Sequence, residues 1–100
     1  MKSLLDKRTS VSVGDARGLA KATWPFGRVT LLQHRILLNT GFKRFELFYN
    51  EIKRIRFLPF QVQIEHNSQT VPEHVDLNGF LILKQIRQAI AAHNLPILTS

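Results

Sequence analysis

The sequence predicts a small, mainly β domain in which about seven short antiparallel strands form a bent sheet or barrel and one helix follows. Three observations lead to this class. Apolar and polar residues alternate with a period of two in several stretches, turn-forming segments separate these stretches, and the apolar period lengthens to that of a helix near the C-terminal end. The 100 residues suffice for one hydrophobic core. We expect a polar lead-in over residues 1–15, the domain over residues 16–95, and a tail over residues 96–100.

The strands are predicted from alternation and from the turns between them. Within the lead-in, Val11 and Val13 alternate with serine, which indicates a short strand over residues 10–14. Trp24-Pro25 then breaks the pattern, because proline donates no backbone hydrogen bond and sits at strand starts or edges. Further strands are expected over residues 26–33, 35–40, 45–49, 52–57, 60–66 and 74–77. Their short connections favour antiparallel pairing between neighbours.

The helix is predicted over residues 79–93. Apolar residues recur at positions 82, 83, 86, 89 and 90, which places them on one helical face, and no proline interrupts the segment. Asn78 is the expected N-cap, since its side chain can accept a backbone hydrogen bond. Asn94 is expected in the left-handed conformation that ends many helices, and Pro96 prevents continuation.

Composition narrows the function to a few partner classes. Fourteen lysines and arginines face seven acidic residues, a net charge of +7. This excess favours nucleic acid, anionic lipid headgroups or an acidic protein, and it also serves simply to keep a small protein in solution. The absence of cysteine excludes disulfides and thiolate chemistry and fits a reducing cytoplasm. Because no stretch has the length of a signal-peptide core or a membrane span, we expect a cytoplasmic protein.

Three stretches carry a family resemblance: KATWPFGRVTL (residues 21–31), RILLNTGFKRFELFYNEIKRIRF (residues 35–57) and VQIEH (residues 62–66). They look like a first hairpin with an aromatic-proline break, then an apolar strand, a glycine turn, an aromatic strand and the strands beyond it. Together with the closing helix, this arrangement resembles the pleckstrin-homology-like superfold in its small bacterial and GRAM-like versions, over residues 16–95.

The resemblance implies a scaffold that binds lipids, peptides or proteins and is not an enzyme. Lipid-binding members carry a lysine and then a Lys/Arg-x-Arg pattern across the first hairpin. Lys21 and Arg28 match the first two basic positions, and Thr30 stands where the pattern has its last arginine. This departure, together with the short turn around residues 24–27, argues against phosphoinositide binding.

The chain lacks the motifs of familiar catalytic centres. It has no Gly-x-Ser-x-Gly, no glycine-rich phosphate loop and no His-Glu-x-x-His, and its carboxylates are scattered. We expect no enzymatic activity, no cofactor and no small-molecule substrate. The pairs Glu65-His66 and Glu73-His74 could hold zinc or nickel if a hairpin brought them together, but their spacing fixes no third ligand. We therefore predict no metal site.

Six cations are candidates for an anion-binding patch. Alternation places Arg54 and Arg56 on the outer face of their strand, and Arg28 could share that face from the neighbouring sheet. The alternative is a charged edge strand, on which positive charge prevents pairing with another chain. The full set is Arg28, Lys43, Arg44, Lys53, Arg54 and Arg56.

Six apolar residues are candidates for a partner interface. Four of them place apolar side chains on both faces of neighbouring strands: Leu32, Ile36, Leu38 and Phe48. This pattern indicates either a second copy of the chain or strong curvature that buries both faces. The other two, Trp24 and Phe26, flank a proline. They are either exposed anchors for a partner or, as we favour, a buried plug at one end of a barrel.

These features together predict a non-enzymatic binding module with a protein partner, including a homodimer. The alternative is a basic nucleic-acid-binding module that uses the six cations. A third interpretation is peripheral binding to anionic membrane lipid. The net charge suits all three partners and does not separate them.

Overall fold

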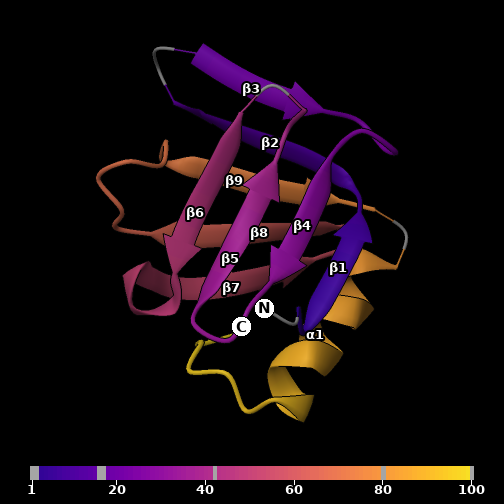
Figure 1. The fold of residues 1–100 in the computed structure, drawn as a ribbon, viewed down its shortest axis with the longest axis vertical. Helices are drawn as coiled ribbons and strands as arrows, with labels where there is room; N and C mark the ends of the chain where they lie inside the picture. Colours follow the sequence, from indigo (N-terminus) through magenta and orange to yellow (C-terminus); the bar gives the residue numbers. More distant parts are fainter. Residues whose placement is uncertain (1–2, 16–17, 42, 80, 100) are drawn as a thin grey trace.

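The computed structural model describes residues 3–15, 18–41, 43–79 and 81–99. These residues form two stacked antiparallel sheets and one α-helix (Figure 1). The elements are β1 (Leu5–Arg8), β2 (Ser10–Asp15), β3 (Gly18–Ala22), β4 (Arg28–Leu31), β5 (Arg35–Asn39), β6 (Arg44–Phe48), the 3-10 turn η1 (Tyr49–Glu51), β7 (Ile52–Leu58), β8 (Gln61–His66), β9 (His74–Asn78) and α1 (Ile82–Ala92). The mainly β class and the C-terminal helix are confirmed, whereas the sheets are stacked and not closed into a barrel.

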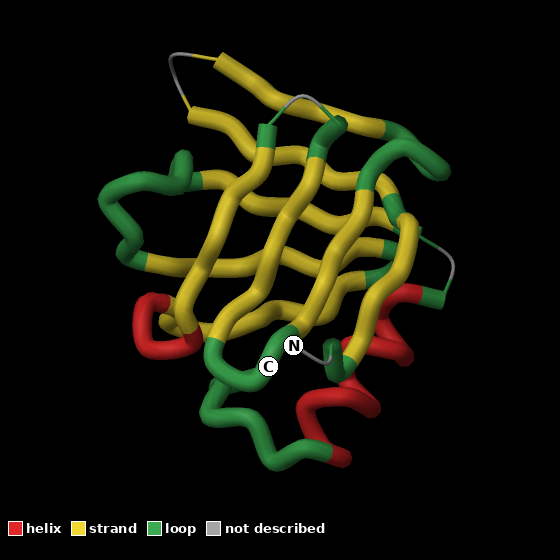
Figure 2. The backbone as a smooth tube through the Cα atoms, viewed as in Figure 1, coloured by secondary structure: helices red, strands yellow, loops and turns green. Residues whose placement is uncertain are grey.

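The two layers cross one another. The four-stranded sheet has the order β1-β4-β5-β6, and the five-stranded sheet has the order β3-β2-β9-β8-β7. Figure 2 shows the strands of one sheet running across those of the other, with the helix at the corner beside β1. Crossed sheets diverge at their corners, and α1 covers one of these corners through contacts with β1 and β8.

One bent hairpin belongs to both sheets. Its first arm is β1 and β2, and its second arm is β3 and β4, so that β1 pairs with β4 in one sheet and β2 pairs with β3 in the other. The predicted lead-in over residues 1–15 therefore needs correction, because residues 5–15 form β1 and β2 and belong to the fold. Val11 and Val13 are buried as the predicted strand requires, and Ser10 and Ser12, which alternate with them, lie on the outer face of the sheet.

The first arm bends at Thr9, which is buried. The Thr9 N–H donates to the Gly27 carbonyl oxygen at 2.9 Å, and the Thr9 hydroxyl donates to the Asn78 carbonyl oxygen at 2.7 Å. A Cβ atom on Gly27 would lie 2.3 Å from the Thr9 carbonyl oxygen. Glycine is therefore required at residue 27 by the close approach of two backbones. This contact fixes where both arms pass from one sheet to the other.

The hydrophobic core lies between the sheets. Inward-facing residues of β4, β5 and β6 meet those of β2, β7, β8 and β9, and three residues of α1 complete the core. Leu32, Ile36 and Leu38 are buried here. They are therefore not available for a partner interface, because the curvature of the fold covers them within one chain. Of the four residues that suggested self-association, only Phe48 is exposed, at 41%.

The helix begins three residues later than predicted and ends one residue earlier, and Asn94 takes the predicted left-handed conformation after it. Its N-cap is Leu81, because Asn78 is the last residue of β9 and is not a cap. At the other end Asn94 has a φ angle of 49°, and the N–H of Leu95 donates to the Ile90 carbonyl oxygen at 3.1 Å. This is the Schellman arrangement in which a left-handed residue closes a helix. Among the described residues, α1 lacks the length and apolar character of a membrane span, and no other α-helix occurs.

The segment after the helix returns to the five-stranded sheet. The Leu98 carbonyl oxygen accepts a hydrogen bond from the Ile55 N–H at 2.8 Å, and Thr99 forms an isolated parallel bridge with Ile55. The predicted tail over residues 96–100 thus contributes to the fold through residue 99. It covers part of the outer edge of β7.

Gly27 offers a test of the corner. We expect Gly27→Ala to lower the free energy of unfolding by about 1–3 kcal/mol or more, since the added Cβ atom would overlap the Thr9 carbonyl oxygen. Gly18→Ala is the matched control, because no atom of the described residues beyond its chain neighbours lies within 4 Å of its Cβ position. Its effect should stay within about 1 kcal/mol. Urea denaturation measures both variants, and equal midpoints would show that the corner relaxes freely.

Candidate functional site

One end of the five-stranded sheet gathers carboxylates. The register pairs Gly14 with His74 and Ile52 with His66, so β2 and β8 end here and β9 and β7 begin here. The acidic residues of this end are Asp15, Glu51, Glu65 and Glu73. Together they make up four of the seven acidic residues in the chain.

The opposite end carries exposed apolar side chains. Trp24, Phe60 and Leu81 are 68%, 68% and 54% exposed. Trp24 lies in the connection from β3 to β4, Phe60 in the turn from β7 to β8, and Leu81 between β9 and α1. Gathered apolar side chains on a surface commonly mark an interaction site. We call these three residues the apolar end.

The register of the sheet places the three connections side by side. The Trp24 N–H donates to the Ser10 hydroxyl oxygen at 3.0 Å. Ser10 pairs with Asn78 at the end of β9, and Asn78 pairs with Gln61, which directly follows Phe60. Neighbouring strands are about 4.8 Å apart. The three connections therefore lie at the same end of the five-stranded sheet.

The connection from β3 to β4 holds two aromatic residues outside the core. The Phe26 N–H donates to the Thr23 carbonyl oxygen at 2.8 Å, which makes a tight turn around the cis Trp24-Pro25 peptide bond. Phe26 is 75% exposed and lies beside the turn between β5 and β6. The prediction that Trp24 and Phe26 form a buried plug is therefore wrong. Both have the exposure that an anchor for a partner needs.

Phe60 is held in an unfavourable backbone conformation. Pro59 and Phe60 are the central residues of the turn that joins Leu58 to Gln61, and Phe60 has a φ angle of 62°. Glycine or asparagine usually takes such a left-handed position, and other residues cost roughly 1–2 kcal/mol there. The exposed ring gains little burial in return. Backbone strain at an exposed aromatic residue is typical of a functional position.

Two cations flank the apolar end. Lys7 and Arg8, the last residues of β1, line a shallow groove together with Trp24 and Leu81. Both cations are exposed, and within the described ranges neither takes part in an ion pair. None of the residues that line the groove is acidic. An anion at this groove would meet two cations and two apolar side chains.

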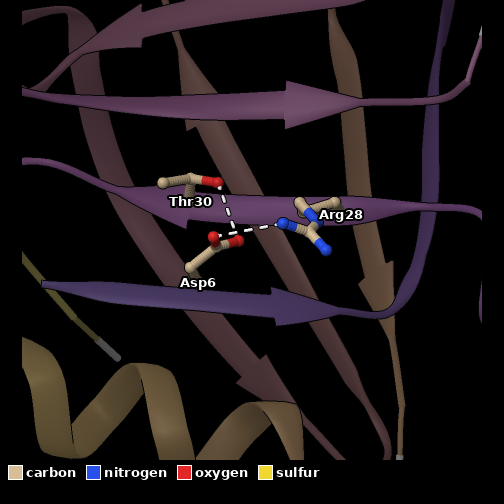
Figure 3. Close-up of polar contacts among 3 residues, drawn as sticks. All are labelled: Asp6, Arg28 and Thr30. Atoms are coloured by element: carbon tan, nitrogen blue, oxygen red, sulfur yellow. Dashed lines mark hydrogen bonds and ion pairs between the residues drawn. The ribbon is translucent and has the colours of Figure 1, made fainter. Parts of the chain in front are cut away.

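A third cation, Arg28, is occupied by a carboxylate of the chain. Figure 3 shows Asp6 of β1 between Arg28 and Thr30 of β4. One Asp6 oxygen accepts from the Arg28 guanidinium at 3.2 Å, and the other accepts from the Thr30 hydroxyl at 3.2 Å. Lys21, the first cation of the resemblance, lies on β3 in the other sheet. Lys21 and Arg28 therefore do not converge on one ligand.

The six predicted cations divide between two surfaces. Arg28, Lys43 and Arg44 belong to the four-stranded sheet and its β5–β6 turn, whereas Lys53, Arg54 and Arg56 belong to β7. The core separates the outer faces of the two sheets, so the prediction that Arg28 shares a face with the β7 cations is wrong. Arg54 is also engaged, because it donates to Glu65 at 2.7 and 3.3 Å. This hydrogen bonding holds the pKa of the Glu65 carboxyl below its ordinary value.

The histidine–glutamate pairs do not assemble a metal site. Nε2 of His66 lies 2.9 Å from the Pro72 carbonyl oxygen, and Nδ1 accepts from the Ser68 N–H at 3.1 Å. Both ring nitrogens of His66 thus have polar partners within the loop between β8 and β9. In the parts of the chain that the structure describes, no three acidic or histidine side chains gather as metal ligands.

Sequence reasoning missed four residues of this surface: Lys7, Arg8, Phe60 and Leu81. Lys7 and Arg8 lie in the predicted lead-in, and Phe60 lies in a predicted strand. One local signal existed, since Pro59-Phe60 separates two alternating stretches where a two-residue turn is expected.

No family model, no curated protein and no solved structure matches this chain.

Phe60 should tolerate a polar replacement. We expect Phe60→Asn to leave the free energy of unfolding unchanged or to raise it by up to about 1 kcal/mol, because asparagine adopts a positive φ angle more readily. Phe57→Asn is the control, since Phe57 packs against the core from an ordinary strand position. It should cost about 2 kcal/mol or more. Thermal or urea unfolding compares the two variants. A comparable loss of unfolding free energy for Phe60→Asn would mean that the Phe60 ring packs against the domain and stabilises it.

Proposed function

We propose that the protein is a non-enzymatic binding module that contacts an anionic partner through its apolar end. One observation carries this proposal, namely that exposed apolar side chains lie together with cations that take part in no ion pair among the described residues. Trp24, Phe60 and Leu81 are exposed at one end beside Lys7 and Arg8. Carboxylates gather at the other end.

Apolar side chains and cations contribute to binding in different ways. Burying a large apolar side chain is worth roughly 1.5–3 kcal/mol, so the three residues of the apolar end could offset much of the association entropy of about 4–15 kcal/mol. The cations attract an anionic partner and orient it.

The order of the elements supports the resemblance to the pleckstrin-homology-like superfold. When each bent arm of the first hairpin is counted once, the chain consists of seven antiparallel segments followed by one helix. The resemblance implies a binding scaffold. The separation of Lys21 from Arg28 favours the apolar end, not the first hairpin, as the place where the partner binds.

A homodimer through the second to fourth predicted strands has less support. Leu32, Ile36 and Leu38 belong to the core, which leaves Phe48 from that set on the surface. Phe48 pairs with Arg35 across β5 and β6. An interface that buried Phe48 would also have to remove the charged Arg35 from water, which is costly. A partner of a different chemistry therefore fits the exposed residues better.

Charge replacement tests the proposal. We expect Lys7→Gln/Arg8→Gln to lower the salt concentration at which the protein leaves a heparin column, because binding of a polyanion releases counterions. Lys53→Gln/Arg56→Gln removes the same charge from β7 and should have the smaller effect. Equal effects of the two double variants would show that retention depends on the total charge and not on Lys7 and Arg8. If the column did not retain the unmodified protein, the proposal would be overturned.

A further inference from the structure

We propose that the outer edge of β3 binds an extended segment of an acidic protein as an additional antiparallel strand. This edge is a second surface, separate from the apolar end, and the inference goes beyond the function proposed above. It depends on the backbone groups of Leu19 and Lys21 and on the groove beside them.

The other edge strands of the two sheets are covered or charged. Residues 98–99 cover part of β7, since the Leu98 carbonyl oxygen accepts from the Ile55 N–H at 2.8 Å. β1 contains three consecutive charged residues and contacts α1. On β6, the Phe48 N–H donates to the Glu51 carboxylate at 3.0 Å. Such features prevent the edge of a sheet from pairing with another chain.

β3 lacks this protection in the described part of the chain. Its sequence, Gly-Leu-Ala-Lys-Ala, contains one charge and no proline, and β2 is the strand with which it pairs. Figure 1 shows β3 at the top of the five-stranded sheet, with no strand beyond it. Leu19 is 66% exposed on this edge strand. An uncovered edge is a template to which an extended peptide can add as a further strand.

The hairpin register shows which backbone groups of β3 face outward. Asp15 and Gly18 close the β2–β3 hairpin across a two-residue connection, so their backbone groups face each other. Bonded pairs alternate with unbonded pairs in antiparallel strands, and Ala20 therefore also bonds to β2. Leu19 and Lys21 direct their N–H and C=O groups to the outer edge. An added antiparallel strand can exchange two hydrogen bonds with each of them.

The added strand would place alternate side chains in a groove between the two sheets. This groove lies between β3 and the β5–β6 turn, has a volume of about 590 Å³, and is lined in part by Val13, Ala20 and Phe45. Ala20 pairs with the buried Val13 and faces the core side of the sheet. Because paired residues point to the same face, the partner residue opposite Ala20 would enter the groove. Phe45 packs against the core there, so an apolar residue fits best.

The charges at this edge favour an acidic partner. Lys21 on β3 and Lys43 on the β5–β6 turn both line the groove. Both are exposed, and within the described ranges neither takes part in an ion pair. Asp15 also lines the groove, at the other end of β3 beside Gly18. An acidic residue opposite Lys21 makes a favourable cross-strand pair, whereas a second copy of the chain would bring another net charge of +7 and repel.

Amide hydrogen exchange measured by NMR tests the pairing. The probe is the capped peptide Glu-Val-Glu-Val-Thr-Val, whose second glutamate would lie opposite Lys21 and whose threonine would lie opposite Leu19. In the free protein, we expect the Ala20 N–H to exchange more slowly than those of Leu19 and Lys21. Peptide at about ten times its Kd should slow exchange at Leu19 and Lys21 about tenfold. Ile55, already bonded to Leu98, should not change.

Variants of the protein separate charge from backbone pairing. Lys21→Glu should weaken the peptide about fivefold or more, because a like-charge pair replaces a pair of opposite charge. It should bind Lys-Val-Lys-Val-Thr-Val better than the acidic peptide. Lys53→Glu makes the same charge change on β7 and should have a smaller effect. Leu19→Pro removes one outward N–H, should also weaken binding, and is checked for folding by urea denaturation.

Variants of the peptide test its hydrogen bonds. N-methylation of the third and fifth peptide residues removes the N–H groups that face β3 and should abolish the protection. N-methylation of the second and fourth residues removes N–H groups that face away from β3, and the protection should remain.

Other results would overturn the proposal. Binding of the peptide without slower exchange at Leu19 and Lys21 would place the peptide elsewhere, and absence of binding would remove the strand partner. Equal protection by the acidic and the lysine peptide would exclude an acidic partner. Protection that rises with protein concentration, without peptide, would assign the edge to a second copy. Lys7→Gln/Arg8→Gln should keep the protection, so this result is independent of heparin retention.

Discussion

The contact between Thr9 and Gly27 is the constraint on which the arrangement of both sheets depends. A hairpin shared by two crossed sheets must bend in both arms at the same level, because the arms stay paired on either side of the bend. The hydrogen bond from the Thr9 N–H joins the arms at this level, and the missing side chain of Gly27 allows the backbones to approach. The Thr9 hydroxyl ties the same point to Asn78, so the first and last strands are fixed together.

The same bend creates the binding surface that we propose. Thr9 alone bends the first arm, whereas residues 23–27 form a bulge on the second, with Trp24 anchored to the Ser10 hydroxyl. Ser10 lies in the row of the register that continues through Asn78 to Gln61. The bulge, the start of α1 and the turn at Phe60 therefore meet at one end of the sheet, although they are far apart in the sequence.

The sequence specifies the strand periods and the helix more clearly than the bends. Val29 and Ile86 follow their expected faces because each has one side on the core. β1 escaped prediction because it is an edge strand whose one apolar residue, Leu5, is only half-buried. Leu32 suggested an interface because alternation assumes a flat sheet, whereas the crossed layers and the following turn cover it. The apolar end depends on the register between distant strands, and no local pattern encodes that register.

The cations that would attract a partner also repel one another within the first hairpin. The ion pair of Figure 3 reduces this repulsion. Arg8 and Arg28 lie directly opposite one another on β1 and β4, and like charges in such pairs are destabilising. Asp6 engages Arg28 from the same face and so offsets the repulsion. Its carboxylate also determines which cation stays available, because Arg28 is held while Arg8 remains beside the groove. One acidic residue thus stabilises the hairpin and leaves Arg8, and not Arg28, as the available cation of this opposed pair.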